Sequence, residues 1–213
     1  MNSTYFITGI GTDVGKTVVS AILVEALEAD YWKPIQAGEL NNSDSLVLER
    51  LVSNKTTKYH KSAFNLETPM SPHAAARIDG VSIKKSKIKR PSTKNKLVIE
   101  GAGGLLVPLN NSETVIDLIK PTDKVIVVSR HYLGSINHTL LSIETLKQRG
   151  LSIFGIVFSG DENKSTESII EKMTGVHILG RIEEEPYFDK NVVKEYASIL
   201  EPRLKQTKNP RLR

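Results

Sequence analysis

The chain has 213 residues, of which 39% are hydrophobic and 25% charged, the composition of an ordinary globular domain with a sizeable core. It contains no cysteine, which excludes a disulfide framework, cysteine-ligated zinc, an iron–sulfur cluster and a thiol nucleophile. The net charge is +5, but the basic segments, residues 84–96 and a tail from about residue 203, lack the interleaved aromatic side chains of nucleic-acid sites.

Short, nearly continuous apolar runs rich in β-branched residues are typical of strands buried on both faces. In chain order these runs are residues 5–8, 31–35, 97–99, 125–128 and 153–158, with a weaker one at 176–179. Helical patterns lie between them, after Lys16, around residues 46–51, and after Gly134 with Gly150 as C-cap, and Ser165 is expected to cap another. The alternation predicts one α/β domain, residues 1–213, with a doubly wound, mostly parallel sheet.

The first predicted strand runs into a glycine-rich segment, Gly9-Ile10-Gly11-Thr12-Asp13-Val14-Gly15-Lys16-Thr17, which opens the first predicted helix. This is the context of a P-loop, although Gly9 and Gly15 are one position further apart than in the common pattern. Backbone N–H groups and the helix dipole would cradle phosphates, Lys16 would reach the β and γ oxygens, and Thr17 would bind Mg²⁺. A simple strand–helix turn leaves Gly-Lys-Thr unexplained, so we predict a nucleotide site in a P-loop NTPase type of sheet.

Two polar side chains stand out in the apolar runs. Lys33 lies in the second run, where a buried ammonium is costly unless it reaches an anion or solvent, and a role beside the P-loop is favoured over an edge strand. Glu100 follows the run at 97–99 and precedes Gly101-Ala102-Gly103-Gly104. We predict that it is a Mg²⁺ or water-orienting carboxylate at the tip of a buried strand.

Three further motifs begin predicted helices. Ser43 reads as an N-cap, and on that evidence capping is favoured over a metal role for Asp44. Ser71 and Pro72 form a good helix start, which leaves the role of His73 open. The start at Ser135 offers free N–H groups for a carboxylate, although capping explains it nearly as well.

Taken in order, these motifs resemble those of dethiobiotin synthetases, enzymes of biotin biosynthesis. The set is the P-loop, Trp32-Lys33-Pro34, Asn42-Ser43-Asp44, Ser71-Pro72-His73, Glu100 to Gly104 and Leu133 to His138, and it spans most of the chain to about residue 150. The resemblance implies a homodimeric ATP-dependent cyclo-ligase. Such an enzyme converts 7,8-diaminononanoate and CO₂ to dethiobiotin through a carbamate and a carbamic–phosphoric anhydride, giving ADP and phosphate.

The resemblance also implies roles for particular residues. Mg²⁺ would be bound by Thr17, Asp44 and Glu100, and Lys16, Lys33 and Thr12 would be catalytic. The residues implied to bind ATP are Gly11, Thr12, Asp13, Val14, Gly15, Lys16, Thr17 and Val18. Those implied to bind the diamine, at a site completed by the dimer partner, are Lys33, Ala37, Gly103, Gly104, Ser135 and Asn137.

The chain departs from the family pattern at several positions. Asp13 stands where a glutamate is usual, and Ala37 where a serine is often found near the diamine. Ser159 and Gly160 replace an Asn-Asp pair that reads the nucleobase, and the later Gly-x-x-Pro feature appears as Gly180-Arg181-Ile182-Glu183. The segment from Gly80 to Leu97 is short and basic where a helix would be expected.

Other functions remain open at this level. One alternative is a partitioning-type P-loop ATPase that binds nucleic acid through its basic residues, and another is a related amide-forming synthetase. A GTPase is disfavoured because residues 163–166 lack the aspartate that would read guanine. No basic segment with a long apolar core begins the chain and no apolar run approaches about 20 residues, so we expect a cytoplasmic protein with no membrane or nucleic-acid partner.

Overall fold

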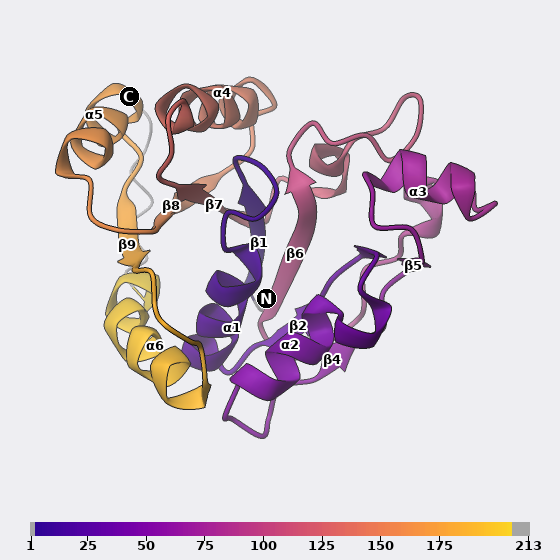
Figure 1. Ribbon diagram of the computed structural model, residues 1–213, viewed down its shortest axis with the longest axis horizontal. Coiled ribbons are helices and arrows are strands. Elements are labelled where there is room, and N and C mark those ends of the chain that lie inside the picture. Colours follow the sequence, from indigo (N-terminus) through magenta and orange to yellow (C-terminus); the bar gives the residue numbers. More distant parts are fainter. Residues whose placement is uncertain (1–2, 206–213) are drawn as a thin grey trace.

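The computed structural model describes residues 3–205 of the chain. The strands of its seven-stranded main sheet are β1 (Thr4–Gly9), β2 (Asp30–Trp32), β4 (Tyr59–His60), β6 (Leu97–Gly104), β7 (Lys124–Arg130), β8 (Ile153–Ser159) and β9 (Ile178–Ile182). Their order is β4-β2-β6-β1-β7-β8-β9, and every neighbouring pair is parallel. This arrangement, drawn in Figure 1, confirms the predicted doubly wound α/β fold.

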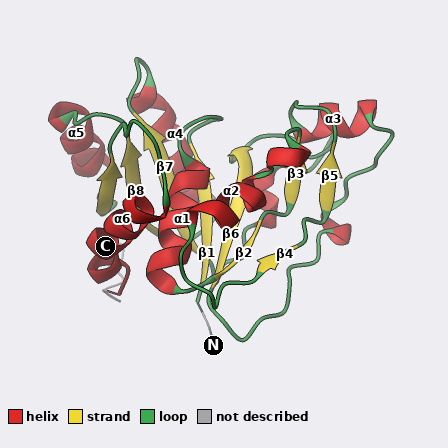
Figure 2. Cartoon of the chain, turned by 60° about the horizontal axis from the view of Figure 1, so that its bottom comes forward, coloured by secondary structure: helices red, strands yellow, loops and turns green. Residues whose placement is uncertain are grey.

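Helices cover both faces of the main sheet. One face carries α1 (Lys16–Leu27), α2 (Asp44–Leu51) and α6 (Lys190–Lys205), and the other carries α4 (Ser135–Gln148) and α5 (Lys164–Thr174). Figure 2 shows β3 (Ile35–Ala37) and β5 (Phe64–Leu66) apart from the main sheet, near α3 (Pro72–Ile78). Short 3-10 helices lie at Leu40–Asn42, Lys85–Lys87 and Val115–Leu118. No helix among residues 3–205 has the length and apolarity needed to span a bilayer.

The central strand β1 shows why its apolar run is nearly continuous. Tyr5 and Ile7 belong to the core cluster formed with α1 and α6, whereas Phe6 belongs to the cluster on the opposite face. Successive strand side chains point to opposite faces, so a strand covered by helices on both faces needs apolar residues at every position. The run therefore places β1 in the middle of the sheet, with the P-loop at its carboxyl end.

The apolar run at residues 31–35 is not one strand as predicted. β2 ends at Trp32, and β3 begins at Ile35 in the small sheet with β5. Pro34 has no N–H group with which to continue the ladder, so the chain leaves the main sheet there. Lys33 consequently lies at the break and not inside a strand.

The limits of β6 also differ from the prediction. The strand continues through Gly104, so Glu100 lies inside it, paired with Ile7 of β1. Its carboxylate is fully buried. Glu100 is therefore an interior strand residue and not the tip of the strand, and the glycines after it extend the strand.

One expectation in the last third of the chain, the helix cap at Ser165, is wrong. The cap of α5 is Asn163, whose side chain accepts a hydrogen bond from the Thr166 N–H at 3.0 Å, and Ser165 lies inside the helix. The first residues of the tail expected from about residue 203 belong to α6, which continues to Lys205 and buries Leu204. The rest of that tail, from residue 206, lies outside the described residues.

The basic segment contributes to the fold. It contains the 3-10 helix Lys85–Lys87 and no α-helix between Gly80 and Leu97, where the family pattern expects one. Arg90 donates to both carboxylate oxygens of Asp123, at 2.6 and 2.8 Å, and to the Leu118 carbonyl at 3.1 Å. The Arg90 guanidinium, the one guanidinium of this segment, is therefore structural and not available to an external polyanion.

We expect Arg90→Ala to lower the free energy of unfolding by about 1.5–3 kcal/mol, because it leaves the buried Asp123 carboxylate without its charged donor. Urea unfolding followed by circular dichroism measures this change. Lys89→Ala is the control, since it removes the same charge from an exposed neighbour. Equal stability of the two variants would contradict a structural role for the Arg90–Asp123 pair.

Candidate functional site

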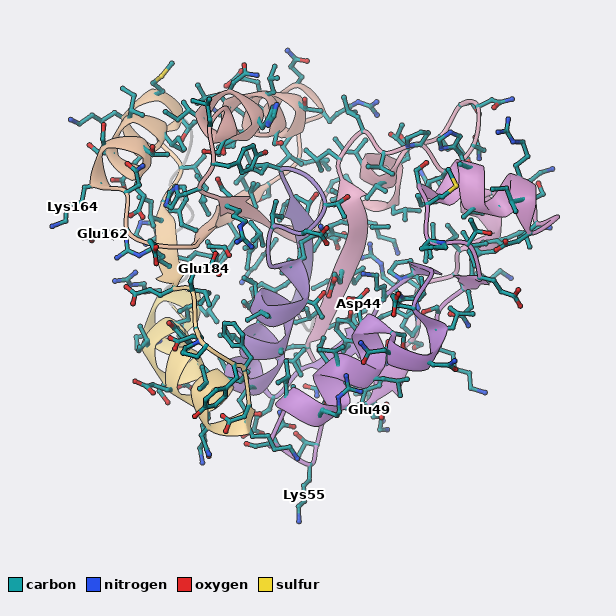
Figure 3. All side chains as sticks on the ribbon, in the orientation of Figure 1. Asp44, Glu49, Lys55, Glu162, Lys164 and Glu184 are labelled. Atoms are coloured by element: carbon teal, nitrogen blue, oxygen red, sulfur yellow. The ribbon has the colours of Figure 1, made fainter. Side chains whose placement is uncertain are left out.

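A cavity of about 820 Å³ lies at the carboxyl ends of β1, β2 and β6, where ligands bind in this type of fold. Most of the predicted site residues line it, namely Thr12, Asp13, Gly15, Lys16, Thr17, Val18, Lys33, Ala37, Asp44, Glu100 and Gly103. Figure 3 shows Asp44 near the middle of the molecule, whereas Lys55 and Lys164 project from its edge. The predicted residues that do not line the cavity are Gly11, Val14, Gly104, Ser135 and Asn137.

The P-loop is held in shape by its backbone conformation. Gly15 precedes α1 with a φ of 88°, in the left-handed region that favours glycine, and a Cβ there would lie 2.9 Å from Ser159 Oγ. Lys16, the first residue of α1, donates from Nζ to the Gly11 carbonyl at 2.8 Å. Val14 packs in the core, so any contribution it makes to ATP comes from its backbone.

The three predicted metal ligands meet in the cavity. Thr17 Oγ1 donates to Asp44 Oδ1 at 2.6 Å and lies 3.1 Å from Glu100 Oε1. A hydroxyl and two carboxylates are the hard oxygen donors that Mg²⁺ prefers. Since the donors come from three separate elements, α1, α2 and β6, and converge within hydrogen-bond distance, they fit a Mg²⁺ ion.

Lys33 lies between the two carboxylates. Its ammonium is 2.9 Å from Glu100 Oε1 and also forms an ion pair with Asp44. Burial alone would lower the pKa of Lys33, but Glu100 and Asp44 together outweigh burial and raise it above its usual value. Lys33 is therefore a fixed cation beside the P-loop, not a snorkelling surface lysine.

The pKa values of Lys16 and Asp44 also depend on burial and on the neighbouring charges. Burial lowers the pKa of Lys16, although Glu100 opposes the change. Burial would raise the pKa of Asp44, but Lys33, the hydrogen bond from Thr17 and the charge of Lys16 together outweigh it, so this pKa lies below its usual value. The cavity thus brings the buried Lys16 and Lys33 ammonium groups together with the carboxyl groups of Asp44 and Glu100.

The helix cap expected at Ser43 is present, and it does not involve the Asp44 side chain. Ser43 Oγ accepts from the Leu46 N–H at 3.4 Å. Asp44 is the next residue, and its N–H donates to Gln36 Oε1 at 3.3 Å while its carboxylate faces Thr17. Capping and metal binding therefore use neighbouring residues and do not exclude each other.

The glycines of β6 let the P-loop approach closely. A Cβ on Gly104 would lie 3.3 Å from the Gly9 carbonyl, and Gly103 has a φ of 66° and lines the cavity. Ala37 lines it from β3, so the diamine-side residues Lys33, Ala37 and Gly103 do share one cavity.

Ser135 and Asn137 are not part of this cavity. They line a separate pocket of about 750 Å³ at the start of α4. The free N–H expected at Ser135 is in use, because it donates to the Tyr132 carbonyl at 3.0 Å, and the Ser135 side chain is buried. Within one chain these residues do not meet the phosphate site.

Several residues near the site carried no clear signal in the sequence. Tyr31 donates from its hydroxyl to Glu100 Oε2 at 2.8 Å, and Gln36 is buried and orders the start of α2. Arg130 lines the cavity and pairs with Glu184 at 2.6 Å. Its place at the end of a predicted strand is the one pattern that could have identified it.

The role of His73, which the sequence left open, gains no support from the cavity. His73 is exposed, does not line the cavity, and lies 3.1 Å from Ser71 Oγ.

Comparisons with known proteins identify the relatives of this chain. The family model described as an AAA domain matches residues 3–192. The ATP-dependent dethiobiotin synthetase of Christiangramia forsetii is 65% identical over 204 residues, covering 96% of this chain and 99% of that protein. The synthetase of the same name from Cytophaga hutchinsonii is 51% identical over 195 residues, covering 91% and 94%.

Among solved structures, the septum site-determining protein MinD of Pyrococcus horikoshii, complexed with Mg-ADP, has a TM-score of 0.60. It is 18% identical, and the match covers 95% of this chain and 90% of that one, so the likeness shows the fold alone. The two synthetases are much more similar in sequence, with 65% and 51% identity over nearly their full length. These identities confirm the resemblance drawn from the motifs. The chain belongs to the ATP-dependent dethiobiotin synthetase family.

Proposed function

We propose that the chain is an ATP- and Mg²⁺-dependent cyclo-ligase that converts 7,8-diaminononanoate and CO₂ to dethiobiotin, with ADP and phosphate as the other products. The observation that carries the proposal is the meeting, in one cavity, of the P-loop lysine, a second buried ammonium and three oxygen ligands. That arrangement suits phosphoryl transfer, which depends on in-line positioning and on neutralising charge.

The proposed reaction has three steps. One amine of the diamine bonds to the carbon of CO₂ and loses a proton, which gives a carbamate. A carbamate oxygen attacks the γ-phosphorus of ATP, the bond to the β–γ bridging oxygen breaks, and ADP leaves. The second amine attacks the carbon of the carbamic–phosphoric anhydride, phosphate leaves with the former carbamate oxygen, and a proton is released as the ring closes.

The residues of the cavity have distinct proposed roles. Lys16 and Lys33 neutralise the charge on the transferring phosphoryl group, and the raised pKa of Lys33 makes it a cation and not a base. Thr17, Asp44 and Glu100 would hold Mg²⁺, which when bound supplies further positive charge to the phosphate oxygens. The amides of residues 11–18 would bind the phosphates. Thr12 is an exposed residue of the same loop and lines the cavity.

We infer that a second copy of the chain completes the diamine site. Ser135 and Asn137 lie outside the phosphate cavity, and Leu133 beside them is fully exposed. An exposed leucine at a helix start is the kind of apolar surface that a partner covers. The start of α4 would thus reach the cavity of the other subunit and bind the substrate carboxylate.

The two alternatives have less support. For a nucleic-acid-binding ATPase, part of the basic segment is already used inside the fold, since Arg90 binds Asp123 and Lys96 donates to the Leu27 carbonyl at 3.2 Å. An amide-forming synthetase would use the same phosphate chemistry on another amine, and only the choice of substrate separates it from this proposal.

The test is an ATP-hydrolysis assay in which 7,8-diaminononanoate and bicarbonate are omitted in turn and product mass is measured. We expect ADP formation to require both, with dethiobiotin as the product. Turnover indifferent to the diamine but dependent on DNA would instead support the partitioning-type alternative. Turnover with another amine alone would support an amide-forming synthetase.

A further inference from the structure

Tyr31 is a fully buried residue of β2 whose hydroxyl points at the metal-ligand cluster. Its oxygen lies 2.8 Å from Glu100 Oε2, and both side chains are fully shielded from solvent. The ring packs in the core, tilted against Tyr59 with 6.3 Å between centroids. A phenylalanine would fill the same volume, so packing alone does not require the hydroxyl.

The sheet register explains why the two groups meet. Tyr31 pairs with Val98 of the parallel strand β6. Side chains two positions apart on a strand share a face, so Glu100 is the next residue after Val98 on the face that Tyr31 occupies. The hydroxyl at the far end of the ring reaches the carboxylate along this face.

The two oxygens of Glu100 have separate partners. Oε2 accepts from Tyr31, whereas Oε1 lies 2.9 Å from the Lys33 ammonium and 3.1 Å from Thr17 Oγ1. The tyrosine thus prevents the carboxylate from turning and keeps Oε1 directed at the cavity. Without it, Oε2 would be a buried acceptor with no partner and would be free to turn toward Lys33.

We propose that Tyr31 is a positioning residue for the metal site, acting through Glu100. The proposal rests on the proposed function, in which Glu100 is a Mg²⁺ ligand. Removing a group that hydrogen-bonds to a metal ligand typically lowers metal affinity or activity by about 10–100-fold, and we expect about a tenfold loss of affinity in Tyr31→Phe.

The experiment measures binding of Mn²⁺ to the protein–ADP complex by electron paramagnetic resonance of the free ion, with an ADP solution as reference. It compares wild type, Tyr31→Phe, Glu100→Gln and the double variant. The matched control is Tyr59→Phe, because Tyr59 packs beside Tyr31 but its hydroxyl lies 3.4 Å from the Leu48 carbonyl and has no bond to Glu100. Thermal melts of each variant report folding separately.

The expected result is about tenfold weaker Mn²⁺ binding in Tyr31→Phe, little change in Tyr59→Phe, and little further effect of Tyr31→Phe once Glu100 is glutamine. A Tyr31→Phe protein that is less stable but binds Mn²⁺ normally would show a structural role and overturn the inference. If Glu100→Gln leaves Mn²⁺ binding unchanged, the assignment of Glu100 to the metal site fails. If Glu100→Gln weakens Mn²⁺ binding but Tyr31→Phe leaves it unchanged, the inference about Tyr31 alone fails.

Discussion

Lys16→Ala is expected to lower ATP-dependent ring closure at least about 100-fold, the scale of losing one preorganised electrostatic stabiliser. Lys16 is buried at the first position of α1, beside the loop that would hold the phosphates. Its bond to the Gly11 carbonyl shows that the ammonium already lies over the loop. Initial rates of dethiobiotin and phosphate formation with saturating diamine and bicarbonate provide the measurement.

The chain offers a close control for this substitution. Lys164 is the first residue of α5, as Lys16 is of α1, but its side chain is 84% exposed and points away from the molecule in Figure 3. Lys164→Ala should leave turnover unchanged. A folded Lys16→Ala protein with wild-type turnover would remove the P-loop lysine from the mechanism, whereas equal losses in both variants would indicate a general effect of lost positive charge.

The main architecture could be predicted because its causes are local. Strands buried on both faces give continuous apolar runs, and the Gly-Lys-Thr segment can be placed because it joins a strand to a helix. The metal ligands were harder, since Thr17, Asp44 and Glu100 are separated by 27 and more positions along the chain. Their grouping depended on the family resemblance, and capping by itself would have explained Asp44.

What could not be predicted depends on register and on competing local signals. The contact between Tyr31 and Glu100 follows from the pairing of β2 with β6, which no local pattern specifies. Helix α6 did have a periodic apolar face, Val193, Ala197, Leu200 and Leu204, but Pro202 lies inside it and is read as a helix breaker. The apolar run at 31–35 does form strands, but Pro34 divides it into two, β2 and β3.

The second large effect is expected at Lys33, where stability and catalysis should separate. Lys33→Met keeps the aliphatic stem but removes the ammonium between Asp44 and Glu100. We expect turnover to fall by at least about 100-fold, because a cation that faces the transferring phosphoryl group is lost. The metal-free protein should also lose stability, since the carboxyl groups of Asp44 and Glu100 then lose the ammonium that pairs with both of them.

Adding Mg²⁺ and ADP should separate the loss of turnover from the loss of stability in Lys33→Met. If Asp44 and Glu100 bind Mg²⁺, the ion replaces the missing positive charge, so Mg²⁺ with ADP should raise the melting temperature of Lys33→Met more than that of wild type, while turnover stays low. The control is Lys124→Met, which removes a half-buried strand ammonium that lies over the rings of Tyr5 and Phe154. Lys124 pairs with Tyr5 near the start of β1, whereas the P-loop follows the other end of that strand. A Lys33→Met protein whose activity returns together with its stability would show that Lys33 only holds the two carboxylates apart, and the phosphoryl group would then be neutralised by Lys16 and the metal alone.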